Sequence, residues 1–104
     1  MPSPATTPQP PYYAVIFTSI RTEGDNGYGE IAKHMVELAA QQPGFLGIES
    51  ARQEIGITVS YWSSLEAIKT WKENIDHRQA RSRAKDWYSK LRVRVCRVER
   101  EYGF

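Results

Sequence analysis

The sequence is poor in the residues on which several kinds of site depend. Its 104 residues include one cysteine, Cys96, and two histidines, His34 and His77. One cysteine excludes an internal disulfide and a zinc site built from several thiolates. There is no two-histidine metal spacing, no glycine-rich phosphate loop and no Ser-His-Asp constellation, so we expect no metal site, no phosphate-binding loop and no catalytic triad.

Long apolar runs and a strong charge of either sign are also lacking. No stretch approaches the roughly 18 apolar residues of a membrane-spanning helix, and we expect no membrane partner. The start of the chain lacks the layout of a signal peptide, which favours a cytoplasmic location. Fourteen Lys+Arg against twelve Asp+Glu leave a net charge of +2, too little to predict a nucleic-acid partner.

Basic residues nevertheless gather in the last third of the chain. Asp86, Glu99 and Glu101 interrupt them. A solvated face is the simpler interpretation, and a pocket for a carboxylate- or phosphate-bearing ligand is the alternative. The residues are Arg78, Arg81, Arg83, Lys85, Lys90, Arg92, Arg94, Arg97 and Arg100.

The length allows one domain, preceded by a proline-rich arm. Residues 1–11 hold five of the six prolines and little that could pack, which predicts a disordered or extended segment. The folded domain is expected over residues 12–104.

Periodicity predicts four strands and the helices between them. Residues 12–20 read as a strand, 28–42 as an amphipathic helix that stops at Pro43, and 45–52 with 55–62 as a hairpin. Ser63 and Glu66 form a capping-box pattern before a second helix, and a further helical stretch is expected over 77–88. A strand over 91–102 closes the chain, and the changed parity of Val98 predicts a bulge or a change of face there.

This order is β-α-β-β-α-β, the ferredoxin-like arrangement of the α+β class. Its antiparallel four-stranded sheet carries helices on one face only. The first strand is apolar on both faces, since Tyr13, Val15 and Phe17 alternate with Tyr12 and Ile16. An uncovered apolar face predicts a homodimer that packs sheet against sheet.

Several passages of the sequence are typical of one known family. They are the turn at 42–45, the Tyr-Trp-Ser-Ser-Leu-Glu-Ala run at 61–67, Trp71, His77 and the closing residues 94–98. In these passages the chain resembles the antibiotic biosynthesis monooxygenase (ABM) family. The resemblance spans residues 12–104 and implies a dimeric α/β barrel. It also implies one of three activities: oxygenation of aromatic molecules without metal or flavin, haem cleavage, or action on small signalling or quinone-like molecules.

Haem cleavage is disfavoured residue by residue. Haem-cleaving members resemble one another in an Asn on the first strand, a Trp on the second helix and an axial His on the next helix. Trp71 fills the Trp position, but the first strand has no Asn and Arg81 stands where the axial His would fall. A guanidinium stays protonated and cannot ligate iron.

The resemblance therefore favours a cofactor-independent monooxygenase acting on a small aromatic or quinone-like molecule. His77 is the candidate base, because imidazole titrates near neutrality, and Arg81 is the candidate partner for an anionic substrate. The aromatic walls of the substrate pocket are expected to come from Phe17, Tyr61, Trp62 and Trp71.

A structural role competes with each of these assignments. His77 follows Asp76 at a predicted helix start, where a histidine often only caps the helix. Trp71 lies in the apolar stripe of its helix and fits core packing. A non-catalytic dimer that binds a small ligand, or is associated with stress, remains the alternative function.

Overall fold

The computed structural model describes residues 3–77 and 83–104, without the side chains of Asp76 and His77. The elements follow one another as β1 (Tyr12–Arg21), α1 (Tyr28–Ala40), β2 (Phe45–Arg52), β3 (Gly56–Trp62), α2 (Leu65–His77), α3 (Ala84–Trp87) and β4 (Tyr88–Val98). The strands and first two helices agree with the predicted order. The predicted helical stretch over 77–88 falls partly on residues 78–82, outside this description.

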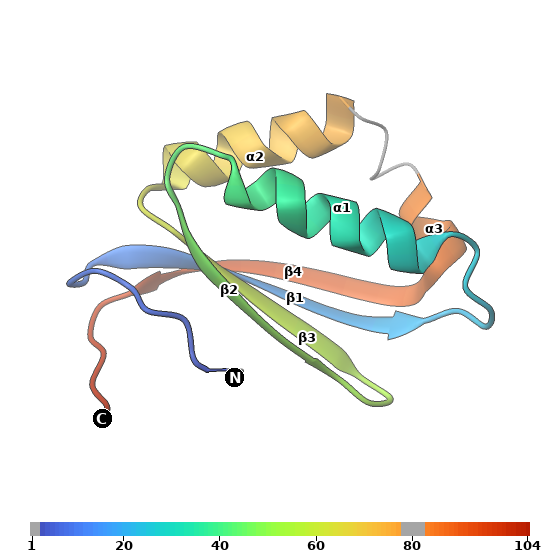
Figure 1. Cartoon of the computed structure of the whole chain (residues 1–104), viewed down its shortest axis with the longest axis horizontal. Helices are drawn as coiled ribbons and strands as arrows, with labels where there is room; N and C mark the ends of the chain where they lie inside the picture. The colour runs from blue at the N-terminus through green and yellow to red at the C-terminus, as the bar shows by residue number, and fades with distance from the viewer. Residues whose placement is uncertain (1–2, 78–82) are drawn as a thin grey trace.

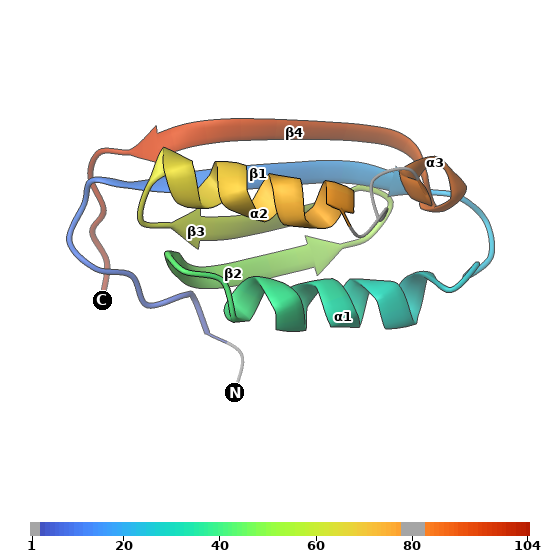
Figure 2. The same cartoon turned by 90° about the horizontal axis from the view of Figure 1, so that it is seen from above.

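The four strands form one antiparallel sheet in the order β2-β3-β1-β4. β1 and β3 lie at the centre, and α1 and α2 both lie over the same face of the sheet (Figure 1, Figure 2). This confirms the predicted α+β, ferredoxin-like fold.

Strand register divides the side chains between a helix-covered face and an open face. Trp62 pairs with Tyr13 across β3 and β1, and its ring contacts α2, so this parity belongs to the helix-covered face. The preceding residue, Tyr61, pairs with Ala14 and belongs to the open face. On the open face, Ile20 and Ile57 are 38% and 45% exposed.

Two local signals set the start of the helices. The N-cap position of α1 is Gly27, and Asp25, two residues earlier, accepts hydrogen bonds from the backbone N–H groups of Gly27 and Gly29 at 3.0 and 3.1 Å. The predicted Ser63 cap of α2 is wrong by one residue. Ser64 accepts the N–H of Ala67 at 3.0 Å instead, because α2 begins at Leu65.

The closing strand also differs from its prediction. β4 ends at Val98, and its register with β1 is continuous from Lys90 to Val98, which pairs with Tyr12. Of the two alternatives predicted for Val98, the bulge is wrong and the change of face is confirmed. Val93 and Val95 pair with Phe17 and Val15 on the helix-covered face, whereas Val98 pairs with Tyr12 on the open face. The register shift lies at Ile20 and Arg21 instead.

Residues 3–11 contain no helix or strand and pass under the open face at one end of the sheet (Figure 1). The backbone N–H of Ala5 donates to Glu49 Oε2 at 2.8 Å, and Thr7 Oγ1 donates to the Tyr12 hydroxyl at 2.9 Å. The arm therefore covers the end of the open face where Tyr12 is buried.

Among residues 3–77 and 83–104, no helix has both the length and the apolar character that crossing a membrane requires.

Candidate functional site

The helix-covered face carries an aromatic cluster beneath α2, which we call the tryptophan cluster (Phe45, Trp62 and Trp71). The Trp62 and Trp71 rings stack with centroids 6.0 Å apart and planes 24° apart. Phe45 meets Trp62 edge-on at 5.4 Å. Trp62 has no exposed surface, whereas Trp71 is half-buried, so the Trp71 ring is the accessible part of this cluster.

A second aromatic cluster lies toward the other end of the same face. We call it the tyrosine cluster (Phe17, Tyr28, Trp87 and Tyr88). Tyr88 meets Phe17 edge-on at 5.3 Å and Tyr28 at 5.5 Å. Trp87 is buried beside Tyr28 at 6.5 Å. The cluster thus joins β1, the start of α1 and the start of β4.

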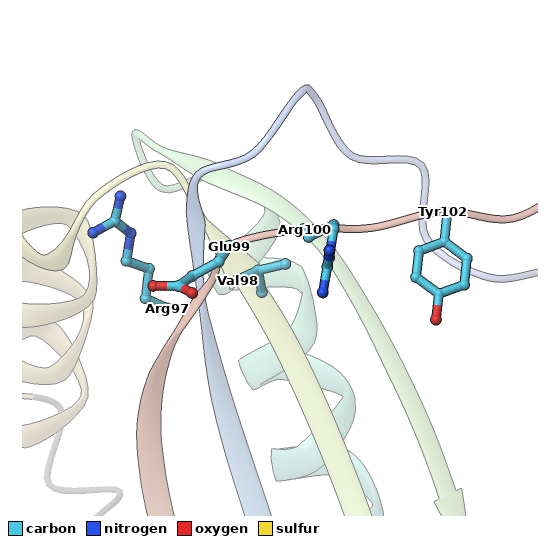
Figure 3. A pocket seen from close by; sticks show the side chains of 5 residues that line it. All are labelled: Arg97, Val98, Glu99, Arg100 and Tyr102. Atoms are coloured by element: carbon cyan, nitrogen blue, oxygen red, sulfur yellow. The ribbon is translucent and has the colours of Figure 1, made fainter.

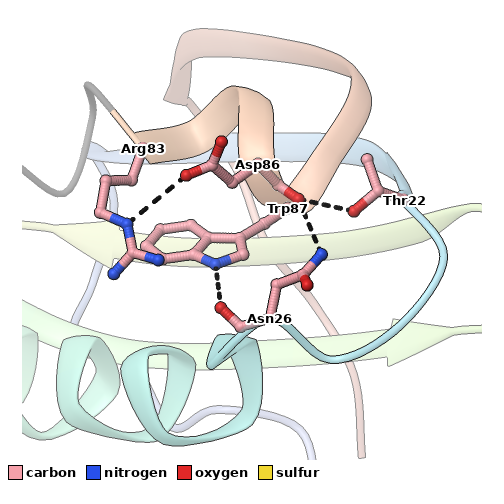
Figure 4. Close-up of polar contacts among 5 residues, drawn as sticks. All are labelled: Thr22, Asn26, Arg83, Asp86 and Trp87. Atoms are coloured by element: carbon pink, nitrogen blue, oxygen red, sulfur yellow. Dashed lines mark hydrogen bonds and ion pairs between the residues drawn. The ribbon is translucent and has the colours of Figure 1, made fainter.

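The segment before β4 is held against the β1–α1 loop by polar contacts (Figure 4). Trp87 Nε1 donates to the Asn26 carbonyl at 3.0 Å, and Thr22 Oγ1 donates to the Asp86 carbonyl at 2.7 Å. Arg83 lies over the Trp87 ring and pairs with Asp86 at 3.6 Å. These contacts fix the backbone from which Tyr88 projects.

Two guanidinium groups border the tyrosine cluster. Arg21 stacks over the Tyr28 ring, 3.6 Å from its centroid, and its Nε donates to the Trp87 carbonyl at 2.9 Å. Arg52, at the end of β2, reaches across Gly56 and donates hydrogen bonds to the hydroxyl and carbonyl of Ser19. A Cβ at Gly56 would overlap the Arg52 guanidinium, so the guanidinium holds this position only because residue 56 has no side chain.

The Tyr88 phenol is biased toward its neutral form. Burial raises its pKa well above the usual value of 10, and a hydrogen bond with Tyr28 adds to this effect. The positive charges of Arg52 and Arg21 oppose the shift without cancelling it. Tyr88 therefore keeps its proton at any physiological pH and can serve as a hydrogen-bond donor.

Tyr61 lies on the other side of the sheet. Its hydroxyl donates to Glu49 Oε1, and its ring meets Tyr12 edge-on at 5.8 Å. Burial raises the pKa of Tyr61 to about 12, helped by the hydrogen bond to Glu49. Tyr61 therefore lies on the opposite face of the sheet from Phe17 and Trp62, with which it was predicted to line one pocket.

The predicted site residues fall into three groups. Trp62 and Trp71 are brought together, and Phe17 shares their face but belongs to the tyrosine cluster. Tyr61 is on the open face. The His77 side chain and Arg81 lie outside the described residues, so their roles stay predictions.

Sequence patterns do not single out Arg21, Arg52, Tyr28 or Tyr88 as site residues. Tyr28 stands out only as part of a helical stripe, and Tyr88 only as the end of a predicted helical stretch. These two tyrosines are 60 positions apart in the chain, and no local pattern links them. The proximity of Arg52 to Ser19 likewise depends on sheet order.

A shallow hollow lies at the C-terminal end of β4. It is lined by Arg97, Val98, Glu99, Arg100 and Tyr102, which all come from one chain segment (Figure 3). The side chains are spread along that segment, and no second element supplies a facing wall. We therefore do not regard this hollow as the functional site.

The basic residues of the last third do not form a single patch. Arg92 and Arg94 pair with Thr18 and Ile16 on the open face, whereas Arg97 pairs with Tyr13 on the helix-covered face. Arg83 and Lys85 belong to the α3 region. Within the part of the chain that is described, no three His, Cys, Asp or Glu side chains are placed to hold a metal ion.

Comparison with known sequences extends this picture. The sequence model for antibiotic biosynthesis monooxygenases (ABM) matches residues 11–83. The Bacillus subtilis (strain 168) protein YqjZ, itself uncharacterized, is 53% identical over 101 residues, covering 94% of this chain and 89% of YqjZ.

Solved structures share the fold at low sequence identity. A mutant of SnoaB, a cofactor-independent oxygenase from Streptomyces nogalater, superposes with a TM-score of 0.74 at 9% identity, covering 88% of this chain and 95% of SnoaB. A proposed antibiotic biosynthesis monooxygenase from Nitrosomonas europaea gives 0.68 at 13% identity, covering 93% and 96%. With a family model that covers most of the folded domain, and a relative that shares half of its residues, the chain belongs to the antibiotic biosynthesis monooxygenase family.

Proposed function

We propose that this protein is a cytoplasmic, cofactor-independent monooxygenase that oxidises a small aromatic or quinone-like molecule with O₂. Membership of the ABM family and a fold shared with the oxygenase SnoaB support a reaction of this class. Because one fold can host many functions, the activity has to be argued from the site itself.

The observation that carries the proposal is the tryptophan cluster on the helix-covered face. Trp71 stacks on Trp62 and is itself only half-buried, while Phe45 meets Trp62 edge-on. A planar aromatic substrate can continue such a stack. Phe17 provides a further apolar surface on the same face.

The chemistry needs a base and a group that stabilises an anion. In this proposal His77, the last residue of α2, removes a proton from a carbon or hydroxyl next to the aromatic ring, and Arg81 stabilises the anion. The electron-rich anion reduces O₂ and combines with it to form a peroxide. For an anthrone, this peroxide loses water to give the quinone, so a CH₂ group becomes C=O and one O₂ yields one carbonyl oxygen and one water.

We further propose a homodimer formed through the open face of the sheet. Ile20 and Ile57 expose apolar surface there, on the side that carries no helix. Burial of such a face against a second copy is favourable, at about 25 cal/mol per Å² of apolar area.

The test is oxygen uptake by the purified protein with a panel of anthrones and hydroquinones, measured with an oxygen electrode and by product mass. An active anthrone should consume one O₂ per molecule and take up one ¹⁸O atom from ¹⁸O₂. We expect His77→Gln to lower kcat at least about a hundredfold, as for loss of a general base. His34→Gln, an exposed histidine on α1, is the matched control and should retain full activity.

Two results would contradict the proposal. Saturable binding of these compounds without O₂ uptake would identify a non-catalytic ligand-binding protein. Full activity of His77→Gln would show that another group acts as the base.

A further inference from the structure

We propose that Arg52, together with the phenols of Tyr28 and Tyr88, forms a subsite for the anionic oxygen of an aromatic ligand. The subsite lies in the tyrosine cluster, at the opposite end of the helix-covered face from Trp62 and Trp71. It deepens the proposed function, since the deprotonated substrate of that reaction is an aromatic anion, but its test does not depend on turnover.

The first support is the charge of the two guanidinium groups. Among the described side chains, those of residues 3–75 and 83–104, neither Arg21 nor Arg52 makes an ion pair with a carboxylate. Arg21 donates to the carbonyl oxygens of Trp87, Gly24 and Asp25, which carry no net charge. Two cations without a carboxylate on one side of an aromatic cluster favour an anionic ligand.

The second support is the number of free donors on Arg52. A guanidinium has five N–H donors, and Arg52 uses one on the Ser19 hydroxyl and one on the Ser19 carbonyl. Ser19 is buried, so these bonds fix the guanidinium in place from the sheet side. Arg52 is itself exposed, which leaves the remaining donors accessible to a ligand.

The third support is the phenol pair. The Tyr28 and Tyr88 rings meet edge-on with centroids 5.5 Å apart, and each phenol carries an O–H group that can donate a hydrogen bond. The Tyr88 ring contacts Phe17, and the Tyr28 ring contacts Arg21. Phe17, Tyr28 and Tyr88 are all half-buried, so part of each side chain is exposed to solvent. Aromatic edges next to positive donors fit an aromatic ring that bears an ionised oxygen, as in a phenolate, enolate, carboxylate or sulfonate.

The experiment compares two fluorescent probes that share the same rings. The first, 1-anilinonaphthalene-8-sulfonate, is an aromatic anion, and the second, N-phenyl-1-naphthylamine, lacks the sulfonate. Fluorescence titration of the full chain should show tighter binding of the anion. Arg52→Gln should weaken binding of the anion about tenfold, as expected for loss of a charge-assisted hydrogen bond, and change binding of the neutral probe less than about twofold.

Matched variants separate charge from fold. Arg92→Gln removes an exposed arginine from the opposite face of the sheet and should leave both probes unaffected. Ser19→Ala removes the hydroxyl but keeps the cation, and should retain most of the anion binding. Gly56→Ala places a Cβ where the Arg52 guanidinium lies, so it should displace the side chain and reproduce the loss seen with Arg52→Gln.

The proposal is overturned if Arg52→Gln and Gly56→Ala leave anion binding unchanged, or if they weaken both probes equally. If Arg52→Gln does not fold, Gly56→Ala decides alone. Absence of O₂ uptake would count against the monooxygenase and not against this subsite. If the protein consumes O₂ but Arg52→Gln and Gly56→Ala bind the anion as tightly as the unmodified chain, the subsite is contradicted and the monooxygenase is not.

Discussion

The indole of Trp62, at the end of β3, stacks on the indole of Trp71, on α2, with the ring centroids 6.0 Å apart. Trp62 is fully buried, and its Nε1 donates to Ser60 Oγ at 2.9 Å. The one polar group of the indole therefore has a hydrogen-bond partner within the same strand. One tryptophan therefore anchors the helix to the sheet, and the other presents the ring that a ligand can reach.

The first prediction concerns this anchor. Trp62→Ala should lower the free energy of unfolding by about 3–5 kcal/mol, because it removes a fully buried indole and leaves a cavity. Trp62→Phe should keep part of the packing, so its free energy of unfolding should fall less than that of Trp62→Ala. Urea unfolding followed by far-UV circular dichroism measures both, with Leu65→Ala, an exposed position, as the control. A loss below about 1 kcal/mol for Trp62→Ala would contradict the anchoring role.

The second prediction concerns the turn into β2. Gly44 has φ of +85°, and a Cβ there would lie 2.6 Å from the Ala67 Cβ and 2.7 Å from Ser63 Oγ. Gly44→Ala should therefore cost about 1–3 kcal/mol through backbone strain and overpacking against α2. Gly103→Ala meets nothing within 4 Å and is the control. Equal melting temperatures for the two variants would show that the turn relaxes freely.

The third prediction concerns alkaline pH. The pKa of Tyr61 is about 12 in the folded chain and about 10 in the unfolded chain. Below about pH 10 the Tyr61 phenol is protonated in both the folded and the unfolded chain, so its contribution to the free energy of unfolding is fully present. As pH rises from about 10 toward 12 the unfolded chain loses the proton first, and stability falls.

Unfolding in urea at about pH 9 and about pH 11, on either side of the unfolded-state pKa, measures this loss. Tyr61→Phe should lose less stability between the two pH values than the unmodified protein. Tyr88 also has a raised pKa, so part of the loss should persist in Tyr61→Phe and disappear only when Tyr88→Phe is added. Tyr102→Phe, on the exposed C-terminal tail, should behave like the unmodified protein. If Tyr61→Phe lost as much stability between the two pH values as the unmodified protein, the raised pKa of Tyr61 would not be the cause of the loss.

The fourth prediction concerns self-association through the open face. Light scattering after size exclusion should give twice the 11.9 kDa protomer mass. Ile57→Glu places a charge on the open face of β3 and should shift the protein to monomer. Ile55→Glu, at the equally exposed turn before β3, should leave the dimer intact. A monomer at micromolar concentration before any substitution would remove the basis of the proposed dimer.

Short-range patterns are enough for the element order. The alternation over 55–62 predicts β3, and Pro43 predicts the end of α1. Such signals work because backbone periodicity and end-capping depend on residues within one or two turns of each other. The same alternation places the side chains of Tyr61 and Trp62 on opposite faces of the sheet. The prediction that both line one pocket is inconsistent with that alternation.

By itself the sequence determined the strands, the first two helices and their ferredoxin-like order. Only the tertiary structure decided that Tyr88 meets Tyr28 and Phe17, and that Arg52 lies on Ser19. These residues are 33 to 71 positions apart in the chain, since 52 − 19 = 33 and 88 − 17 = 71. Their contact depends on β1 lying between β3 and β4, and strand order is set by the packing of the whole sheet rather than by any local pattern.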